Sequence, residues 1–200
     1  MTVNNMRRNY LLGLLTVAAC TLPSCASSPV YVNSEADFGF YQRVGVVPFS
    51  SLTGDRSASD RVTASFITEL LMAGAVEVAP AGDFYKAVRE AIKGDRVNLP
   101  EEITAAEATV LGQVTGVQGI FVGAVRDYGM TRVGSDEFPL VGVIVRFLDC
   151  NSGRVVWSYE VTRRGGPRLP IVSFGETHTL GEMTTKVCRD MATRFSDALK

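Results

Sequence analysis

The N-terminus of this 200-residue chain combines a short basic segment with a short apolar run. Arg7 and Arg8 lie shortly before the run Leu11–Ala19, and no acidic residue precedes it. A run of roughly 10 residues is about half of what a membrane-spanning helix needs. The pattern therefore predicts a signal peptide over residues 1–24, which takes no part in the folded unit that the rest of the chain forms.

A cysteine follows this segment in a setting that resembles the lipobox of bacterial lipoproteins. Leu22-Pro23-Ser24-Cys25 places an apolar residue three positions before Cys25 and a small residue directly before it. Val17-Ala18-Ala19-Cys20 fits the same pattern, so Cys20 is the alternative lipidation site. We favour Cys25 because its apolar run is longer and the residues after it are small and polar. A plain cleaved signal peptide with incidental cysteines is the remaining alternative.

The resemblance to lipoproteins implies a location and a membrane contact. An acylated cysteine anchors a protein stably because several acyl chains bind a bilayer far more strongly than one. Ala26 follows Cys25, and not the Asp that resembles an inner-membrane retention signal in that family. The family rule therefore favours the outer membrane, with the protein lipid-anchored and facing the periplasm. The expected organisation is a lipidated tether over residues 25–42 and one periplasmic domain over residues 43–200.

Composition and the lack of motifs exclude several functions. The formal net charge is −1, so the chain lacks the basic surplus that binding to nucleic-acid phosphates requires. The single histidine, His178, leaves little scope for metal sites or histidine-dependent catalysis, and we expect it to be a surface or capping residue. No Walker A, G-x-S-x-G or H-E-x-x-H motif occurs. We therefore expect no enzymatic activity, no cofactor, no metal and no nucleic-acid partner.

Alternating strand and helix patterns predict a single α/β (α+β) domain. The expected order is β-α-β-α-α-β-β-β-α, which gives a mixed sheet of about five strands with helices packed on it. The three long strand patterns cover Gly119–Tyr128, Leu140–Asp149 and Val155–Thr162. Cys150-Asn151-Ser152-Gly153 predicts a hairpin turn between the last two. Residues 27–41 show no sustained period and belong to the tether.

Capping residues mark where the helices begin. Ser57 with Asp60 fits an S-x-x-D capping box, Asp83 is a single cap, and Thr104 with Glu107 fits a second box. These positions predict three helix starts in the first half of the domain.

Trp157 and Tyr159 lie two residues apart in the last strand pattern, so they share one face of that strand. Their size favours a role in covering the sheet against a helix. An exposed aromatic binding patch is the alternative.

Arg163, Arg164 and Arg168 form the one basic cluster of the domain, beside Gly165-Gly166-Pro167. Arginines in a solvated loop are free to bind carboxylates bidentately, so we predict that these three bind a partner. A solvated strand end without a partner is the alternative.

Cys150 and Cys188 remain in the mature domain. The periplasm is oxidising, so the two could form a disulfide. Each also fits the role of a small buried apolar residue. Both alternatives are open at the level of sequence.

The hairpin segment Asp149–Ser158, with the sequence DCNSGRVVWS, resembles a motif of periplasmic lipoproteins related to CsgG and LpoB. Three further segments resemble that group in the same order along the chain: Gly45–Gly54, Leu71–Val78 and Gly116–Val125. The resemblance covers roughly residues 43–162. It implies an outer-membrane lipoprotein of the CsgG/LpoB-like superfamily, of the curli-assembly or penicillin-binding-protein activator type, with no catalytic residues to transfer.

Two departures from that superfamily limit its specific activities here. LpoB-like activators carry a long Pro-rich tether, whereas the roughly 18 residues from Cys25 to Arg43 reach at most about 60 Å. CsgG-like channels need additional long amphipathic strand pairs, which the sequence lacks beyond its core sheet. The expected function is a non-catalytic protein-binding or assembly factor in envelope biogenesis, cell-wall synthesis or secretion, with an envelope protein or a homo-oligomer as partner. The alternative is a lipoprotein enzyme or a small-ligand or glycan binder that uses the loop 163–178.

Overall fold

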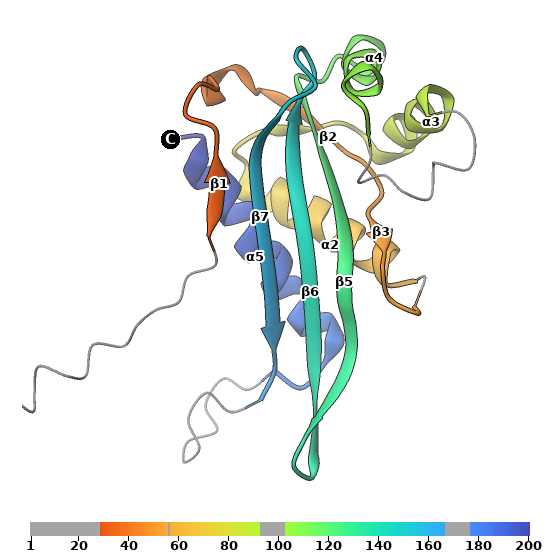
Figure 1. Ribbon diagram of the computed structural model, residues 1–200, viewed down its shortest axis with the longest axis vertical. Coiled ribbons are helices and arrows are strands. Elements are labelled where there is room, and N and C mark those ends of the chain that lie inside the picture. Colours follow the sequence, from red (N-terminus) through yellow and green to blue (C-terminus); the bar gives the residue numbers. More distant parts are fainter. Residues whose placement is uncertain (1–28, 56, 93–102, 167–176) are drawn as a thin grey trace, which may run out of the picture.

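The computed structural model describes residues 29–55, 57–92, 103–166 and 177–200. Its main feature is a mixed sheet whose three longest strands run side by side (Figure 1). These are β5 (Gly119–Val133), β6 (Asp136–Asp149) and β7 (Val155–Arg164), which pair antiparallel in chain order. Cys20, Cys25 and Arg168 lie outside the described residues.

Four short strands complete the sheet. β2 (Arg43–Val46) pairs parallel with β5 and with β4 (Glu77–Val78), while β3 (Ser50–Ser51) pairs parallel with β5. β1 (Val30–Val32) pairs antiparallel with β7 at the other edge. The sheet order is β1-β7-β6-β5-β2-β4, with β3 off this path.

The predicted mixed α+β architecture is confirmed, although the sheet has seven strands where about five were expected. The additional strands are β1 and β3, which are three and two residues long. Segments this short show no readable period in a sequence. β1 also lies within the region that we expected to be an unstructured tether, so that expectation was wrong for Val30–Val32.

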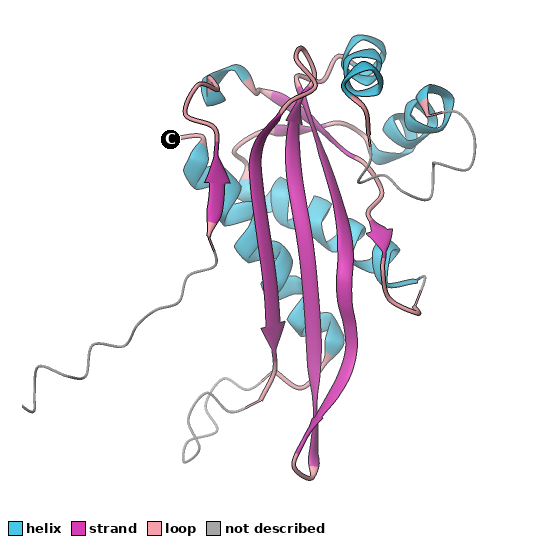
Figure 2. Cartoon of the chain, in the orientation of Figure 1, coloured by secondary structure: helices cyan, strands magenta, loops and turns pink. Residues whose placement is uncertain are grey.

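Two pairs of helices pack on the sheet and create a core on each side (Figure 2). α2 (Ser57–Ala73) and α5 (Leu180–Ala198) lie behind the long strands in this view and bury the larger core. α3 (Ala81–Ala91) and α4 (Ala105–Thr115) contribute to the second core, near one end of β5 and β6. None of the helices among the described residues has both the length and the apolarity to cross a membrane.

One of the predicted helix caps is confirmed and two differ. Thr104 and Glu107 form the expected capping box at the start of α4. α2 begins at Ser57, but its first turn is held by Asp55, whose carboxylate accepts hydrogen bonds from the Ser57 backbone N–H and hydroxyl. At α3 the capping position is Pro80, and Asp83 lies within the first turn, where negative charge suits the helix dipole.

Trp157 and Tyr159 cover the sheet against α5, as the sequence predicts. Both are buried, at 0% and 2% exposure, and the Trp157 ring lies edge-on to Phe195 of α5 at a centroid distance of 5.4 Å. The alternative of an exposed aromatic patch is therefore wrong.

The two cysteines of the domain are free thiols. Cys150 belongs to the core under α3 and α4, whereas Cys188 belongs to the core under α2 and α5, so the disulfide alternative is wrong. Burial raises the pKa of each thiol to about 12, with a smaller contribution from Asp149 at Cys150 and from Glu69 at Cys188. Both residues are therefore protonated, unreactive core residues at neutral pH.

Candidate binding pocket at the end of the sheet

The structure places the predicted basic cluster in two different environments. Arg163 lies in β7 and its guanidinium donates to Oδ2 of Asp190 in α5 at 2.6 Å. Arg164 is exposed at the end of the same strand. Arg163 is thus paired with a carboxylate of the same chain, which the sequence did not predict, while the partner-binding role of the cluster stays a prediction.

Asp190 receives two hydrogen bonds on one oxygen. The Tyr159 hydroxyl donates to Oδ2 at 3.0 Å, alongside the guanidinium of Arg163, and Arg194 lies 3.7 Å from Oδ1. Burial alone would raise the pKa of Asp190, but the hydrogen bonds from Arg163 and Tyr159 and the nearby positive charges outweigh it and lower the pKa. The carboxylate therefore joins β7 to α5 in its charged form.

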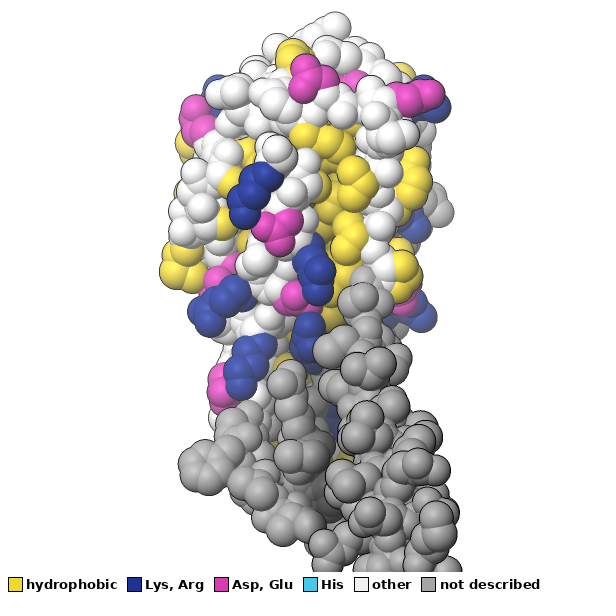
Figure 3. Space-filling view, turned by 90° about the vertical axis from the view of Figure 1, so that its left-hand side faces the viewer, with side chains coloured by type: hydrophobic (Ala, Val, Ile, Leu, Met, Phe, Trp, Pro, Cys, Tyr) yellow, Lys and Arg dark blue, Asp and Glu magenta, His cyan; other side chains and the backbone are white. Residues whose placement is uncertain are grey.

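Charges elsewhere on this side of the molecule are also mixed in sign. Figure 3 shows basic side chains interspersed with acidic ones, next to a strip of hydrophobic side chains. Interspersed charges of this kind neutralise one another locally and give no extended field that would attract a polyanion.

His178 is exposed, as expected for a surface residue, and its ring lies 6.2 Å from the ring of Phe138. It directly precedes Thr179, which caps α5 by accepting a hydrogen bond from the Glu182 backbone N–H. Most of the loop 163–178, the site of the alternative function, lies outside the described residues. No group of three or more His, Cys, Asp or Glu side chains is arranged to hold a metal ion within the described parts of the chain.

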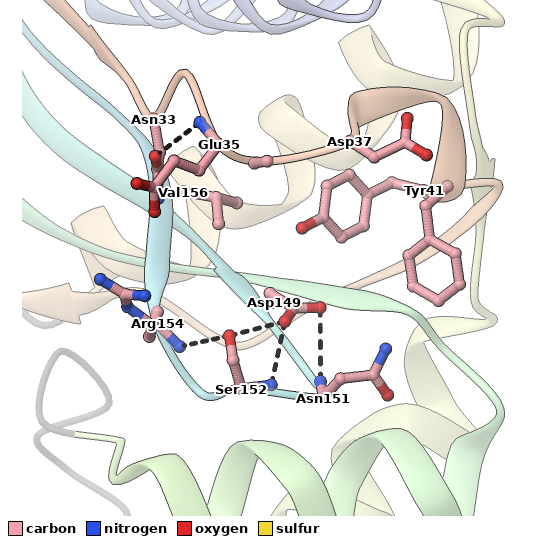
Figure 4. Close-up of a pocket in the computed structure, with 11 residues that line it drawn as sticks. Asn33, Glu35, Asp37, Tyr41, Asp149, Asn151, Ser152, Arg154 and Val156 are labelled. Carbon is pink, nitrogen blue, oxygen red and sulfur yellow. Dashed lines mark hydrogen bonds between the residues drawn. The ribbon is translucent and has the colours of Figure 1, made fainter.

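A pocket of about 360 Å³ opens between two segments that are far apart in sequence (Figure 4). One wall is the segment Asn33–Tyr41, which follows β1 and contains the short 3-10 helix η1 (Phe38–Phe40). The opposite side, which we call the floor of the pocket, is the β6–β7 turn with the first residues of β7. The backbone N–H of Asn33 donates to the carbonyl of Val156 at 2.8 Å, which fixes the two walls to each other.

The β6–β7 turn is held by the carboxylate of Asp149. Its Oδ1 accepts from the Asn151 backbone N–H, and its Oδ2 accepts from the backbone N–H and the hydroxyl of Ser152 (Figure 4). Gly153 closes the turn with a φ of 68°, a conformation that favours glycine. The turn predicted from the sequence is therefore confirmed and forms the floor of the pocket.

The opposite wall uses the same kind of local bond. Oδ1 of Asn33 accepts from the Glu35 backbone N–H, and Oδ1 of Asp37 accepts from the Gly39 backbone N–H, each at 3.0 Å. Short polar side chains that bond to the backbone two residues ahead stabilise turns in this way. The segment thus holds a defined shape beside the sheet.

Tyr41 is one of the two buried residues that line the pocket, with Val156. It is 5% exposed, and its ring lies edge-on to Phe147 in the core at 4.9 Å. Its hydroxyl points into the hollow, and no described residue forms a hydrogen bond with it (Figure 4). Burial, reinforced by the charges of Asp149 and Asp37, raises the pKa of Tyr41 to about 12, so the phenol is neutral at physiological pH.

The charge of the lining is negative. Glu35, Asp37 and Asp149 supply three carboxylates, against the single guanidinium of Arg154. This site was not predicted from the sequence, because residues 25–42 were assigned to the tether. The available signal was the series of turn-forming residues Asn33 and Asp37 directly before the aromatic segment Phe38–Tyr41, which is unusual for a linker.

Comparisons with known proteins place the fold. No known protein family matches the sequence, and no curated protein matches it. Among solved structures, a PelC dodecamer from Paraburkholderia phytofirmans is similar with a TM-score of 0.56 and 20% identity, covering 85% of this chain and 96% of that chain. Lipoprotein GNA1162 from Neisseria meningitidis gives a TM-score of 0.53 and 20% identity, over 76% of this chain and 99% of the other. The chain thus shares its fold with proteins that include a lipoprotein.

The resemblance to LpoB that the sequence indicates is also found, more weakly. The C-terminal domain of LpoB from Salmonella enterica has a TM-score of 0.42 and 13% identity, over 66% of this chain and 87% of that chain. A likeness this weak carries no functional argument. The comparisons give no support to the CsgG and curli part of the expected resemblance.

Proposed function

We propose that the chain is a lipid-anchored periplasmic protein that binds an envelope protein or further copies of itself and performs no catalysis. The observation that carries the proposal is the lipobox at Cys25 in a chain whose domain has the same fold as lipoprotein GNA1162. Ala26 after the cysteine favours the outer membrane. The absence of catalytic motifs from the sequence favours binding over chemistry.

Self-assembly is supported by the similarity to PelC, which forms a dodecamer. The described surface also exposes large apolar side chains in adjacent positions. They are Leu71 and Met72 near the end of α2, and Val110 and Val114 one turn apart on α4. Neighbouring exposed apolar residues favour contact with another protein surface. Envelope biogenesis, cell-wall synthesis and secretion are the processes in which we propose that such an assembly acts.

The anchor is tested by substitution and fractionation. Cys25→Ala should release the protein from membranes, whereas Cys20→Ala should leave it bound. Mass spectrometry of the membrane-extracted protein should find an acylated N-terminal fragment that begins at Cys25. Release by Cys20→Ala but not by Cys25→Ala would assign the lipid to Cys20, and release by neither would refute the anchor.

Partner binding is tested separately by chemical crosslinking in intact cells, followed by affinity purification. A ladder of multiples of the chain mass supports self-assembly, and a defined second protein supports a heterologous partner. A chain that stays monomeric and uncrosslinked at native abundance contradicts the proposal.

A further inference from the structure

We infer that a second concave site, on the open face of the sheet, binds a small apolar carboxylate, a free acid whose body is about the size of a phenyl ring. This site has a volume of about 260 Å³ and lies against the middle of β5 and β6. We call it the sheet-face hollow. Binding of such an acid needs neither the proposed anchor nor the proposed protein partner.

The sheet-face hollow lies on the part of the sheet that the described helices leave open. α2 and α5 cover the opposite face of the long strands, while α3 and α4 pack near one end of β5 and β6 (Figure 2). Val122 and Ala124 alternate along β5 with Phe121 and Val125, which belong to the core under α2 and α5. A small molecule therefore reaches the hollow without any rearrangement of the described elements.

The bottom of the hollow is apolar. Val122 and Ala124 are buried there, at 1% and 2% exposure, and Ile144, which pairs with Ala124 across the strands, is half-buried beside them. Ala124 has only a methyl group among larger neighbours, which leaves space above it. Leu52, which follows β3 and is 57% exposed, forms an apolar wall. An apolar cavity of about 150 Å³ holds benzene, so the hollow has room for a phenyl ring and a short acid chain.

Two guanidinium groups line the hollow beside this apolar bottom. Arg126 lies at a β-bulge in β5, a feature that redirects side chains, and its guanidinium pairs with the carboxylate of Glu160 in β7. Arg146 of β6 has no hydrogen bond or ion pair with any described residue. The donors of Arg146 are therefore available to a ligand that enters the hollow.

The charge of these side chains fits a single negative charge. Two guanidiniums and the carboxylate of Glu160 leave one positive charge in excess. A monocarboxylate neutralises this excess, and its two oxygens match the planar fork of the Arg146 guanidinium. A phosphate monoester carries about two negative charges, of which the second would be repelled by Glu160 without a matching cation.

The lining also favours a free acid over the C-terminus of a polypeptide. Apart from the two arginines, the side chains that line the hollow are apolar, and none of them accepts a hydrogen bond. The amide N–H before a C-terminal residue would enter the hollow without an acceptor, which is costly. A free acid has no such group, so its body contacts Ala124 and Ile144 while its carboxylate contacts Arg146.

The test follows the Ile144 methyl signal by NMR, in the full chain solubilised with an uncharged detergent and labelled with 13C at the isoleucine methyl groups. The probe is 3-phenylpropanoate, and its control is 3-phenylpropanamide, which has the same body without the charge. We expect the acid to shift the Ile144 signal, identified by its loss in Ile144→Val, and to bind about five-fold more tightly than the amide. Equal binding of the two probes, or no shift of the signal, overturns the inference.

A pair of arginine variants tests the charged contact. Arg146→Gln should weaken the acid about three- to five-fold and leave the amide unchanged, because only the carboxylate contacts the guanidinium. Arg164→Gln makes the same charge change at the end of β7 and should leave the binding of both probes unchanged. An equal effect of the two variants would reduce the preference to long-range charge and refute a defined site.

The apolar bottom is tested by filling the hollow. Ala124→Val adds two methyl groups there and should weaken the acid and the amide alike, by about five-fold, with circular dichroism to check the fold. If this variant does not fold, Leu52→Ala removes an exposed wall and should weaken both probes about two- to three-fold. Unchanged binding of the acid in whichever variant folds contradicts the inference.

Two further ligands test the chemical class. 3-Phenylpropylphosphonate has the same body with a second charge, and acetyl-glycyl-phenylalanine carries the carboxylate on a peptide. Both should bind more weakly than 3-phenylpropanoate. A phosphonate that binds at least as tightly refutes the preference for one charge, and a peptide that does so refutes the free acid. These measurements need neither lipid nor partner, so their failure is distinguishable from a failure of the proposed anchor or assembly.

Discussion

Asp190 forms an ion pair with Arg163, one of the three arginines of the predicted basic cluster. The sequence shows Arg163 beside Arg164 in a Gly-rich setting, which is typical of a solvated, available pair. The carboxylate that engages Arg163 lies 27 residues later, on a different element, and only the packing of α5 against β7 brings the two together. Local sequence patterns do not show charge pairs of this separation, and this is why the ion pair of Arg163 was not predicted; its role in partner binding stays a prediction.

The lowered pKa of Asp190 gives a pH-dependent prediction. Its folded pKa lies below the unfolded value of about 3.9, so its charge stabilises the fold above that pH and the contribution is lost as the pH falls through the folded pKa. Asp190→Asn should lower the free energy of unfolding by about 1–2 kcal/mol at pH 7. The difference from the wild type should shrink below about pH 4. Urea unfolding at both pH values measures it.

The control for this experiment is Asp197→Asn, in an exposed pair with Lys200. An exposed ion pair contributes little, so the change should stay within about 0.5 kcal/mol at either pH. If Asp190→Asn costs the same at pH 3 as at pH 7, the charge of Asp190 is not what stabilises the contact.

The long elements were predictable and the short ones were not. β5, β6, β7 and the four helices carry sustained patterns of apolar residues, and their burial fixes which face is inward. β1 and β3 are defined by the neighbours they pair with, since two or three residues carry no period of their own. The pocket follows the same division: its floor is a predicted turn, and its other wall follows the unpredicted strand β1.

The turn that forms this floor yields a prediction for one element. Gly153 has a φ of 68°, and a Cβ there would overlap Ala105 at the start of α4. Gly153→Ala should therefore lower the free energy of unfolding by about 2–4 kcal/mol, the sum of backbone strain and overpacking. Thermal unfolding followed by circular dichroism measures the loss.

Gly134, in the β5–β6 turn, is a matched control. Its φ is 64°, but nothing lies within 4 Å of an added Cβ. Gly134→Ala should cost only the strain, about 1 kcal/mol. Equal losses at the two glycines would show that the packing of the turn against α4 contributes nothing.

At the scale of the molecule, one sheet separates two cores of unequal size. The larger core joins α2 and α5 to the long strands, and aromatic rings fill its centre. Phe121, Phe147, Trp157 and Phe195 contact one another there as neighbouring rings. The stability of the whole domain therefore depends on this cluster.

Trp157 tests that dependence. Trp157→Ala should lower the free energy of unfolding by about 3–5 kcal/mol, because it removes the largest buried side chain and leaves a cavity. Trp157→Phe keeps an aromatic ring and removes an indole N–H that has no hydrogen-bond partner among the described residues, so it should cost clearly less. Chemical denaturation compares the three proteins. An unchanged stability in Trp157→Ala would contradict the central role of the cluster.

The pairing of β1 with β7 shortens the segment that would join the domain to the proposed lipid anchor. If the whole segment from Cys25 to Arg43 were free, the tether could extend to about 60 Å. Because β1 starts at Val30, the tether is limited to residues 25–29, which extend to about 17 Å. Val30 pairs with Tyr159 and Val32 with Trp157, so the chain enters β1 from the side of the β5–β6 hairpin. With the proposed lipid on Cys25, the anchor lies within about 17 Å of Val30, and the pocket lies beyond Val32, at the other end of β1.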